Sequence, residues 1–205
     1  LRLVGSEMCI RDRSGRNIPI KWDLETGDNV LWKTDHGRGN ETTPVVANGR
    51  VFVGGNNMPG LVNRFPKNVD LGCLRAYSAE TGEFLWQATH AKLSLGNGHT
   101  DRTRDWPSIG ICSPPTVEGT RLWYVSNRSE VVCLDTEGFR DGKNDGPIVD
   151  ETDGDPTDAD FIWRTDLVKD FGVVPHYASA STVLCVGERC FVITSNGVGK
   201  ITRRL

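Results

Sequence analysis

Short runs of β-prone, mostly apolar residues recur along the chain in pairs, and each pair is separated by a two-residue turn. Three such segments, residues 44–53, 115–124 and 183–192, align without a gap. Their turns are Asn48-Gly49, Gly119-Thr120 and Gly187-Glu188, and these residue types supply the positive φ that tight hairpin turns require. The pattern therefore predicts three β-hairpins.

A second element alternates with the hairpins. It is a polar turn that contains glycine, followed by a strand that ends in tryptophan. The pairs of glycine and tryptophan are Gly27 and Trp32, Gly82 and Trp86, and Gly138 and Trp163. Insertions at about 57–70, 93–111 and 139–161 separate the repeated parts without disturbing their order.

A hairpin, a further strand, a turn and a last strand together make a four-stranded antiparallel sheet, the blade from which propellers are built. One such sheet cannot bury both faces, whereas stacked sheets cover one another and a repeated tryptophan docks between them. The sequence thus predicts an all-β fold, a partial β-propeller of about three four-stranded blades over residues 14–205. Three blades do not close a ring, so we expect a fragment.

Residues 1–13 show no periodic pattern and resemble translated adaptor read-through, so we expect them to be a non-native leader outside the fold. The composition is that of a soluble globular protein, with 37% hydrophobic and 25% charged residues and a net charge of −3. This charge argues against nucleic acid as a partner. No apolar run reaches the roughly 18 residues that a membrane-spanning helix needs.

The segment Thr81-Gly82-Glu83-Phe84-Leu85-Trp86, after Ala76-Tyr77-Ser78, resembles the tryptophan-docking pattern A-x-D-x-x-T-G-K-x-x-W of PQQ-type propellers. Ser78 and Glu83 depart from that pattern. The segment 131–139 further resembles PQQ-binding-like repeat proteins of the planctomycete type. This resemblance implies a propeller whose blades are sealed by Trp32, Trp86 and Trp163, in a full-length protein exported to the periplasm or cell envelope.

Two functions follow from the resemblance. It extends to BamB-like assembly propellers, which implies a noncatalytic binding or assembly scaffold with a protein or another envelope component as partner. The alternative is a quinoprotein alcohol-type dehydrogenase that uses PQQ and calcium, with most cofactor ligands in other blades. Dehydrogenases of that class carry two adjacent cysteines, and no Cys-Cys dipeptide occurs in this sequence. The sequence favours the scaffold and predicts no catalytic residue.

Two insertions and one hairpin entry contain candidate binding residues. The insertion 93–111 mixes charge with one aromatic residue, which suits a recognition loop, although such a loop can equally pack over its own blade. The candidates are His99, Arg104, Asp105 and Trp106, together with His176 at the entry to the third hairpin. In the insertion 139–161, Asp141, Asp145 and Asp150 are spaced as in a calcium loop, but Lys143 occupies a ligand position. A solvated acidic loop that covers a blade edge is the alternative.

Two cysteines belong to the third hairpin. With Gly187-Glu188 as the turn, Cys185 lies directly opposite Cys190, at a spacing near the lower limit of disulfide geometry. The same positions hold Val46 and Val51 in the first hairpin, so two thiols in place of small hydrophobic residues are the other interpretation. An oxidising compartment would favour the bridge.

Overall fold

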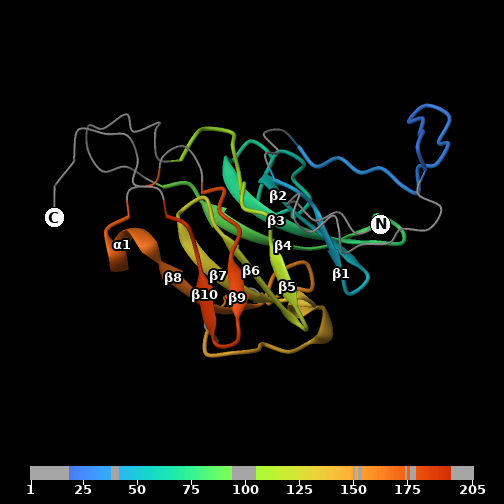
Figure 1. The fold of residues 1–205 in the computed structure, drawn as a ribbon. Coiled ribbons are helices and arrows are strands. Elements are labelled where there is room, and N and C mark those ends of the chain that lie inside the picture. Colours follow the sequence, from blue (N-terminus) through green and yellow to red (C-terminus); the bar gives the residue numbers. More distant parts are fainter. Residues whose placement is uncertain are drawn as a thin grey trace.

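The computed structural model describes residues 19–37, 42–93, 105–149, 151, 154–173, 175 and 179–194. These residues form two four-stranded antiparallel sheets and a separate hairpin (Figure 1). The first sheet has the order β1 (Val45–Ala47), β2 (Arg50–Asn56), β3 (Leu71–Ser78) and β4 (Phe84–Ala91). The second has the order β5 (Thr116–Glu118), β6 (Arg121–Val125), β7 (Glu130–Asp135) and β8 (Phe161–Asp166). The all-β prediction is confirmed.

The three predicted hairpins are β1–β2, β5–β6 and β9 (Leu184–Val186) with β10 (Arg189–Phe191). Asn48 and Gly49 adopt φ values of 53° and 71°, and Gly187 adopts 58°, as tight hairpin turns require. The third blade differs from the expectation of four strands, because among the described residues it comprises β9 and β10 only. The segment around Trp32 contains no strand in its described part, residues 19–37.

The repeated tryptophans do not end their strands. Trp86 is the third residue of β4 and Trp163 the third residue of β8, so the strands continue past them. The sequence analysis predicted that each strand ends at its tryptophan. Ladder hydrogen bonds to the neighbouring strands, β3 and β7, extend the pairing to Ala91 and Asp166.

Two short helices interrupt the strands. The 3-10 helix η2 (Gly138–Asp141) follows β7, and α1 (Leu167–Phe171) follows β8. The carboxylate of Asp166 caps α1 by accepting hydrogen bonds from the backbone amides of Val168 and Lys169. No helix in the described part of the chain is long and apolar enough to cross a membrane.

Apolar side chains hold the sheets together. The main core joins the two four-stranded sheets, and it includes Phe52, Leu74, Trp86, Leu122, Tyr124, Val132 and Leu134. A second cluster joins the other face of the second sheet to the third hairpin, and it includes Val125, Val131, Leu167, Val173 and Val183. The second sheet is therefore packed on both faces, as a blade inside a propeller is.

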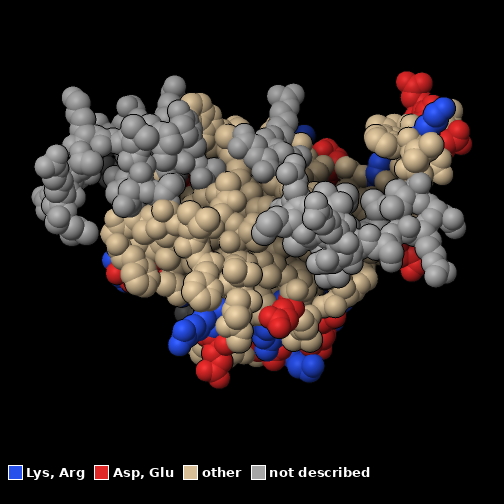
Figure 2. Space-filling model, viewed as in Figure 1, with Lys and Arg blue, Asp and Glu red and all other residues tan. Residues whose placement is uncertain are grey.

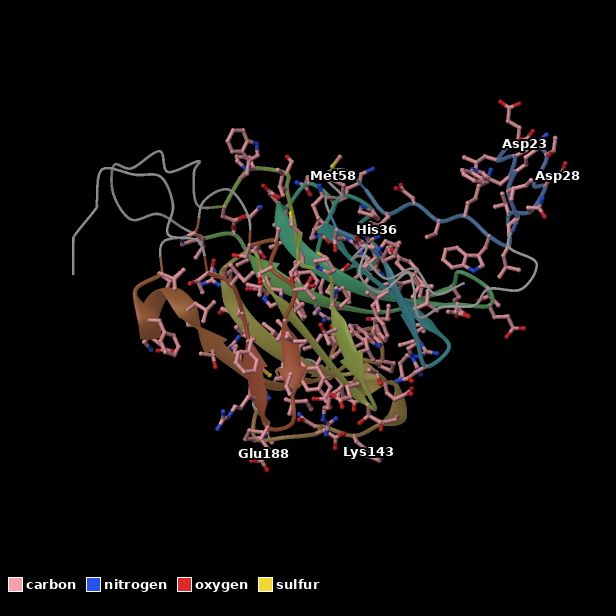
Figure 3. All side chains as sticks on the ribbon, in the orientation of Figure 1. Asp23, Asp28, His36, Met58, Lys143 and Glu188 are labelled. Atoms are coloured by element: carbon pink, nitrogen blue, oxygen red, sulfur yellow. The ribbon has the colours of Figure 1, made fainter. Side chains whose placement is uncertain are left out.

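Charged side chains of both signs gather at one end of the molecule, the lower end in Figure 2. Lys143 and Glu188 mark this end in Figure 3, where the turn of the third hairpin lies. This end of the molecule therefore carries charges of both signs.

Candidate functional site

The indole of one repeat lies on a glycine of the next repeat at two places. Trp86 donates an Nε1 hydrogen bond to the carbonyl oxygen of Thr136 at 3.2 Å. Its ring lies so close to Gly138 that a Cβ atom there would be 2.9 Å from Trp86 Cδ1. The glycine has a φ of 59°, which an L side chain rarely adopts. Glycine is therefore required at this position for two reasons, the positive φ of the backbone and the close contact with the Trp86 ring.

Trp32 repeats this arrangement on the first sheet. Its Nε1 donates to the carbonyl oxygen of Ala79 at 3.0 Å, and its ring covers Gly82. Ala79 directly follows β3 just as Thr136 directly follows β7, so the two contacts occupy equivalent places. Gly27 has positive φ but no atom within 4 Å of a Cβ built on it.

A histidine four residues after the tryptophan also repeats, and the sequence analysis missed it. His36 follows Trp32 and His90 follows Trp86 at this spacing, whereas Leu167 occupies the third copy. His36 (Figure 3) lies 2.7 Å through Nε2 from the carbonyl oxygen of Gly54. Because a carbonyl only accepts, Nε2 donates. Burial lowers the pKa of His36, which favours the neutral ring.

His90 lies between the two sheets. Its Nε2 is 2.6 Å from the hydroxyl of Tyr124, and its Nδ1 is 3.6 Å from the Glu130 carboxylate. Burial raises the pKa of Tyr124 well above 10, so this phenol stays protonated. Burial also raises the pKa of Glu130, but the hydrogen bonds and charges of His90, Ser126 and Arg128 outweigh it and lower the value to about 2. A carboxylate, an imidazole and a phenol thus form one chain across the interface.

A polar pocket of about 610 Å³ opens beside His90 and Glu130. Both sheets contribute to it, and α1 closes one side. Arg128, Arg164 and Lys169 supply positive charge to its wall, and Asp166 and Asp170 supply negative charge. Arg128 Nε lies 3.6 Å from Glu130, and the Asp166 carboxylate caps α1. Arg164 and Lys169 are both exposed.

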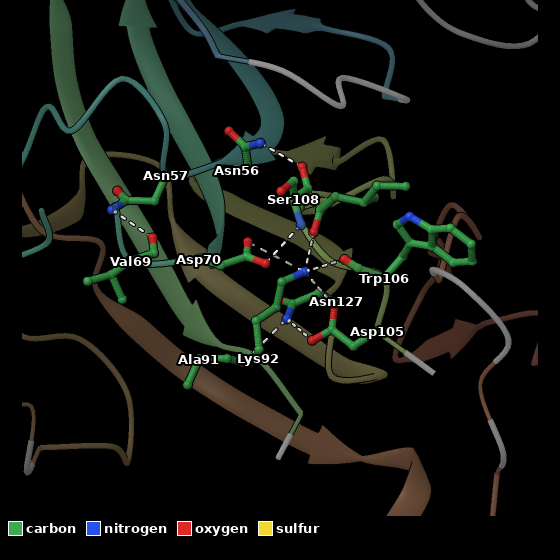
Figure 4. Close-up of polar contacts among 12 residues, drawn as sticks. Asn56, Asn57, Val69, Asp70, Ala91, Lys92, Asp105, Trp106, Ser108 and Asn127 are labelled. Carbon is green, nitrogen blue, oxygen red and sulfur yellow. Dashed lines mark hydrogen bonds and ion pairs between the residues drawn. The ribbon is translucent and has the colours of Figure 1, made fainter. Parts of the chain in front are cut away.

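The second part of the insertion 93–111 is held by a largely buried ion pair between Lys92 and Asp105 (Figure 4). Lys92 Nζ lies 2.7 Å from Asp105 Oδ1, and Asp105 Oδ2 accepts from the Leu93 amide at 2.9 Å and from Asn127 Nδ2 at 2.8 Å. The Asp105 side chain is only 4% exposed, whereas Trp106 is 38% exposed. Asp105 therefore anchors this part of the loop.

Residues 12–96 match the family model described as outer membrane protein assembly factor BamB. The match spans Trp32, Trp86 and all four strands of the first sheet, whose topology is that of a propeller blade. Residues 12–96 thus resemble a PQQ-like propeller repeat. The resemblance inferred from the docking pattern is thereby confirmed for the repeat family. No curated protein matches the chain.

The acidic insertion 139–161 turns back onto the first sheet. The backbone amide of Gln87 in β4 donates to the carbonyl oxygen of Thr157 at 2.9 Å, and the backbone amide of Ala159 donates to the carbonyl oxygen of Gln87 at 3.2 Å. Arg64 forms an ion pair with Asp158. The insertion therefore covers the exposed edge of β4, a position where an unpaired strand invites association.

Two of the three calcium candidates, Asp141 and Asp145, lie in the described structure, and each has a positively charged neighbour. Asp141 accepts hydrogen bonds from the amide and the ammonium of Lys143, and Asp145 lies 3.7 Å from Arg121. Among the described residues, no group of three or more His, Cys, Asp or Glu side chains is placed to hold a metal ion. Asp150 lies outside the described residues, as do the loop candidates His99, Arg104 and His176.

Trp163 and the paired cysteines belong to the contact with the third hairpin. Trp163 and Cys185 are both partly buried against the second apolar cluster. Cys185 pairs with Cys190 in the ladder, and their Sγ atoms are 3.2 Å apart. The structure thus brings these two thiols together and leaves Cys73, Cys112 and Cys133 buried elsewhere.

Proposed function

We propose that this chain is part of a noncatalytic propeller that binds a protein of the cell envelope. The matched family model is described as an outer membrane assembly factor, which supports a role in assembly and export of the full-length protein to the periplasm or envelope. On this proposal Trp32, Trp86 and Trp163 dock blade on blade, and the described pocket contributes to the binding surface.

The observation that carries the proposal is the way in which the acid–base groups are used. Tyr124 is fully buried, and its hydroxyl contacts His90. Glu130 faces His90 on one oxygen and Arg128 on the other. A general base needs access to a reacting proton. His90 and Glu130 line the pocket, but they are only 4% and 8% exposed and contact one another across the sheet interface. They stabilise the stacking of the blades.

The groups that remain for a partner are the charges at the mouth of the pocket. Three exposed charged side chains lie in the pocket wall around His90 and Glu130: Arg164, Lys169 and Asp170. Exposed charges of both signs on a rigid scaffold determine specificity and association rate more than raw affinity. This arrangement suits recognition of a partner protein with complementary charged side chains.

A quinoprotein dehydrogenase is the competing function. PQQ would need calcium ligands, and the described residues offer no converging set of them. The decisive experiment is incubation of the purified protein with PQQ and calcium, followed by dialysis, absorbance and dye-linked alcohol oxidation. We expect no retained quinone. Stoichiometric uptake with turnover would replace the scaffold by the dehydrogenase.

Partner binding is tested with a photo-crosslinking side chain at Lys169, in intact envelopes. We expect a specific crosslink to a component of the outer-membrane assembly machinery, and we expect Arg164→Glu to weaken it. The matched control places the same group at Glu80, an exposed residue in the turn between β3 and β4. Equal crosslinking from both positions would contradict a binding role for the pocket.

A further inference from the structure

Two thiols face each other across the third hairpin. The ladder pairs Cys185 with Cys190, Val186 with Arg189 and Leu184 with Phe191. The Sγ atoms of the two cysteines are 3.2 Å apart. A disulfide bond requires about 2.05 Å between sulfurs and about 4.4–6.8 Å between Cα atoms. The two sulfur atoms are thus about 1 Å farther apart than a disulfide bond requires.

The turn determines which kind of pair this is. In a hairpin with a two-residue turn, the residues that flank the turn exchange hydrogen bonds, and here these are Val186 and Arg189. Cys185 and Cys190 therefore form the next, non-hydrogen-bonded pair, whose Cα atoms approach to about 4.5 Å. That is the antiparallel position in which side chains come closest together.

The environment of the pair differs from that of every other described cysteine. Cys190 is exposed and Cys185 is half-buried, whereas Cys73, Cys112 and Cys133 are at most 2% exposed. Burial and the neighbouring Cys190 raise the pKa of Cys185 to about 12, so Cys185 stays protonated at neutral pH. Cys190 is the more accessible of the two. Replacement of core hydrophobic residues does not explain a side chain that is exposed.

We propose that Cys185 and Cys190 form a reversible dithiol–disulfide site that exchanges with an external disulfide, such as oxidised glutathione or the disulfide of an oxidoreductase. Cys190 gives up its proton to water and attacks one sulfur of the external disulfide; a mixed disulfide forms, and the thiolate that leaves takes up a proton to become the first thiol. Cys185 then gives up its proton to water and attacks the sulfur of Cys190, which releases the second thiol. Two protein thiols are oxidised, and one external disulfide is reduced.

The bridge would act on the contact between the hairpin and the second sheet. Cys185 packs against the cluster that contains Val183, and the hydroxyl of Thr116 donates to the carbonyl oxygen of Val183. The hydroxyl of Ser113 donates to the carbonyl oxygen of Ser181 at 2.6 Å. Oxidation stiffens the hairpin that these bonds hold, so the oxidised form should resist protease cleavage in this segment.

Peptide mapping tests the proposal without ambiguity. Trypsin cuts after Lys169, Arg189 and Lys200, so a bridge joins peptides 170–189 and 190–200, which separate on reduction. The folded chain is equilibrated with reduced and oxidised glutathione, alkylated and digested. We expect this linked pair at least tenfold above any other cysteine pairing.

The control variants separate a built site from chance oxidation. Cys133→Ala should leave the linked pair unchanged, and Cys185→Ala should leave Cys190 as a mixed disulfide with glutathione. Both cysteines fully alkylated across the glutathione series would overturn the proposal, as would linkage that forms only in denaturant or preferentially with Cys133. None of these outcomes depends on PQQ or on a partner, so the test is independent of the proposed function.

Discussion

Replacement of Gly138 by alanine tests the contact through which Trp86 joins the two sheets. A Cβ atom at this position would lie 2.5 Å from the Asp158 carbonyl oxygen and 2.9 Å from Trp86 Cδ1. Both neighbours are fixed, one by the backbone and the other by full burial of the indole. Overpacking of a close-packed interior costs about 1–3 kcal/mol. The left-handed backbone costs an L residue a further 1–2 kcal/mol, roughly.

Gly119→Ala is the matched control. Gly119 has a φ of 57°, close to the 59° of Gly138, but nothing lies within 4 Å of a Cβ built on it. The two alanine variants therefore share the backbone cost and differ in the contact with Trp86 and Asp158. We expect Gly119→Ala to lose about 1–2 kcal/mol of unfolding free energy and Gly138→Ala to lose about 1–3 kcal/mol more.

Urea unfolding at fixed protein concentration, followed by tryptophan fluorescence, measures both losses. The chain has six tryptophans, so five still report on unfolding when Trp86 is replaced. Equal m-values would show that the same structure unfolds in each variant. In a Trp86→Ala background, the additional loss of unfolding free energy caused by Gly138→Ala should shrink to the part that arises from the contact with Asp158. If the two glycine variants lose the same free energy, the close approach of Trp86 to Gly138 does not stabilise the sheet contact.

Three further predictions concern the polar contacts. The pKa of Glu130 is lowered to about 2, so its carboxylate stabilises the fold fully above the ordinary pKa of 4.5 and loses this effect as the pH falls toward 2. Glu130→Gln should therefore unfold at a lower urea concentration than the unmodified chain at pH 7, and the difference between their urea midpoints should narrow at pH 3. Asp105→Asn removes the charge that pairs with Lys92 and should cost about 3–5 kcal/mol in thermal unfolding, whereas a cost below about 1 kcal/mol would show that the pair is screened by water. Trp86→Phe loses the hydrogen bond to Thr136 and should cost about 0.5–1.5 kcal/mol in urea unfolding beyond its cavity term, with an unchanged midpoint as the contradicting result.

Local features of the fold were predictable because short-range geometry determines them. A two-residue turn fixes hairpin register, so the opposition of Cys185 and Cys190 followed from the position of Gly187-Glu188 alone, and the ladder confirms it. The glycine-and-tryptophan repeat likewise indicated a blade, and the blade indicated a propeller family. Helix α1 was missed because its five residues are too few to show a period, and its start depends on one capping carboxylate, Asp166.

The sites between sheets could not be predicted in this way. His90, Tyr124 and Glu130 lie on three strands, and Lys92 pairs with Asp105 inside a long insertion. No regular spacing in the sequence predicts either contact. The repeated histidine after tryptophan was a visible signal, but its partners were not. The amino-acid sequence determined the strands and their register through backbone and turn preferences over a few residues. Only the stacking of one sheet on another decided which buried polar groups meet, because desolvation and pairing act between residues that are distant in the chain.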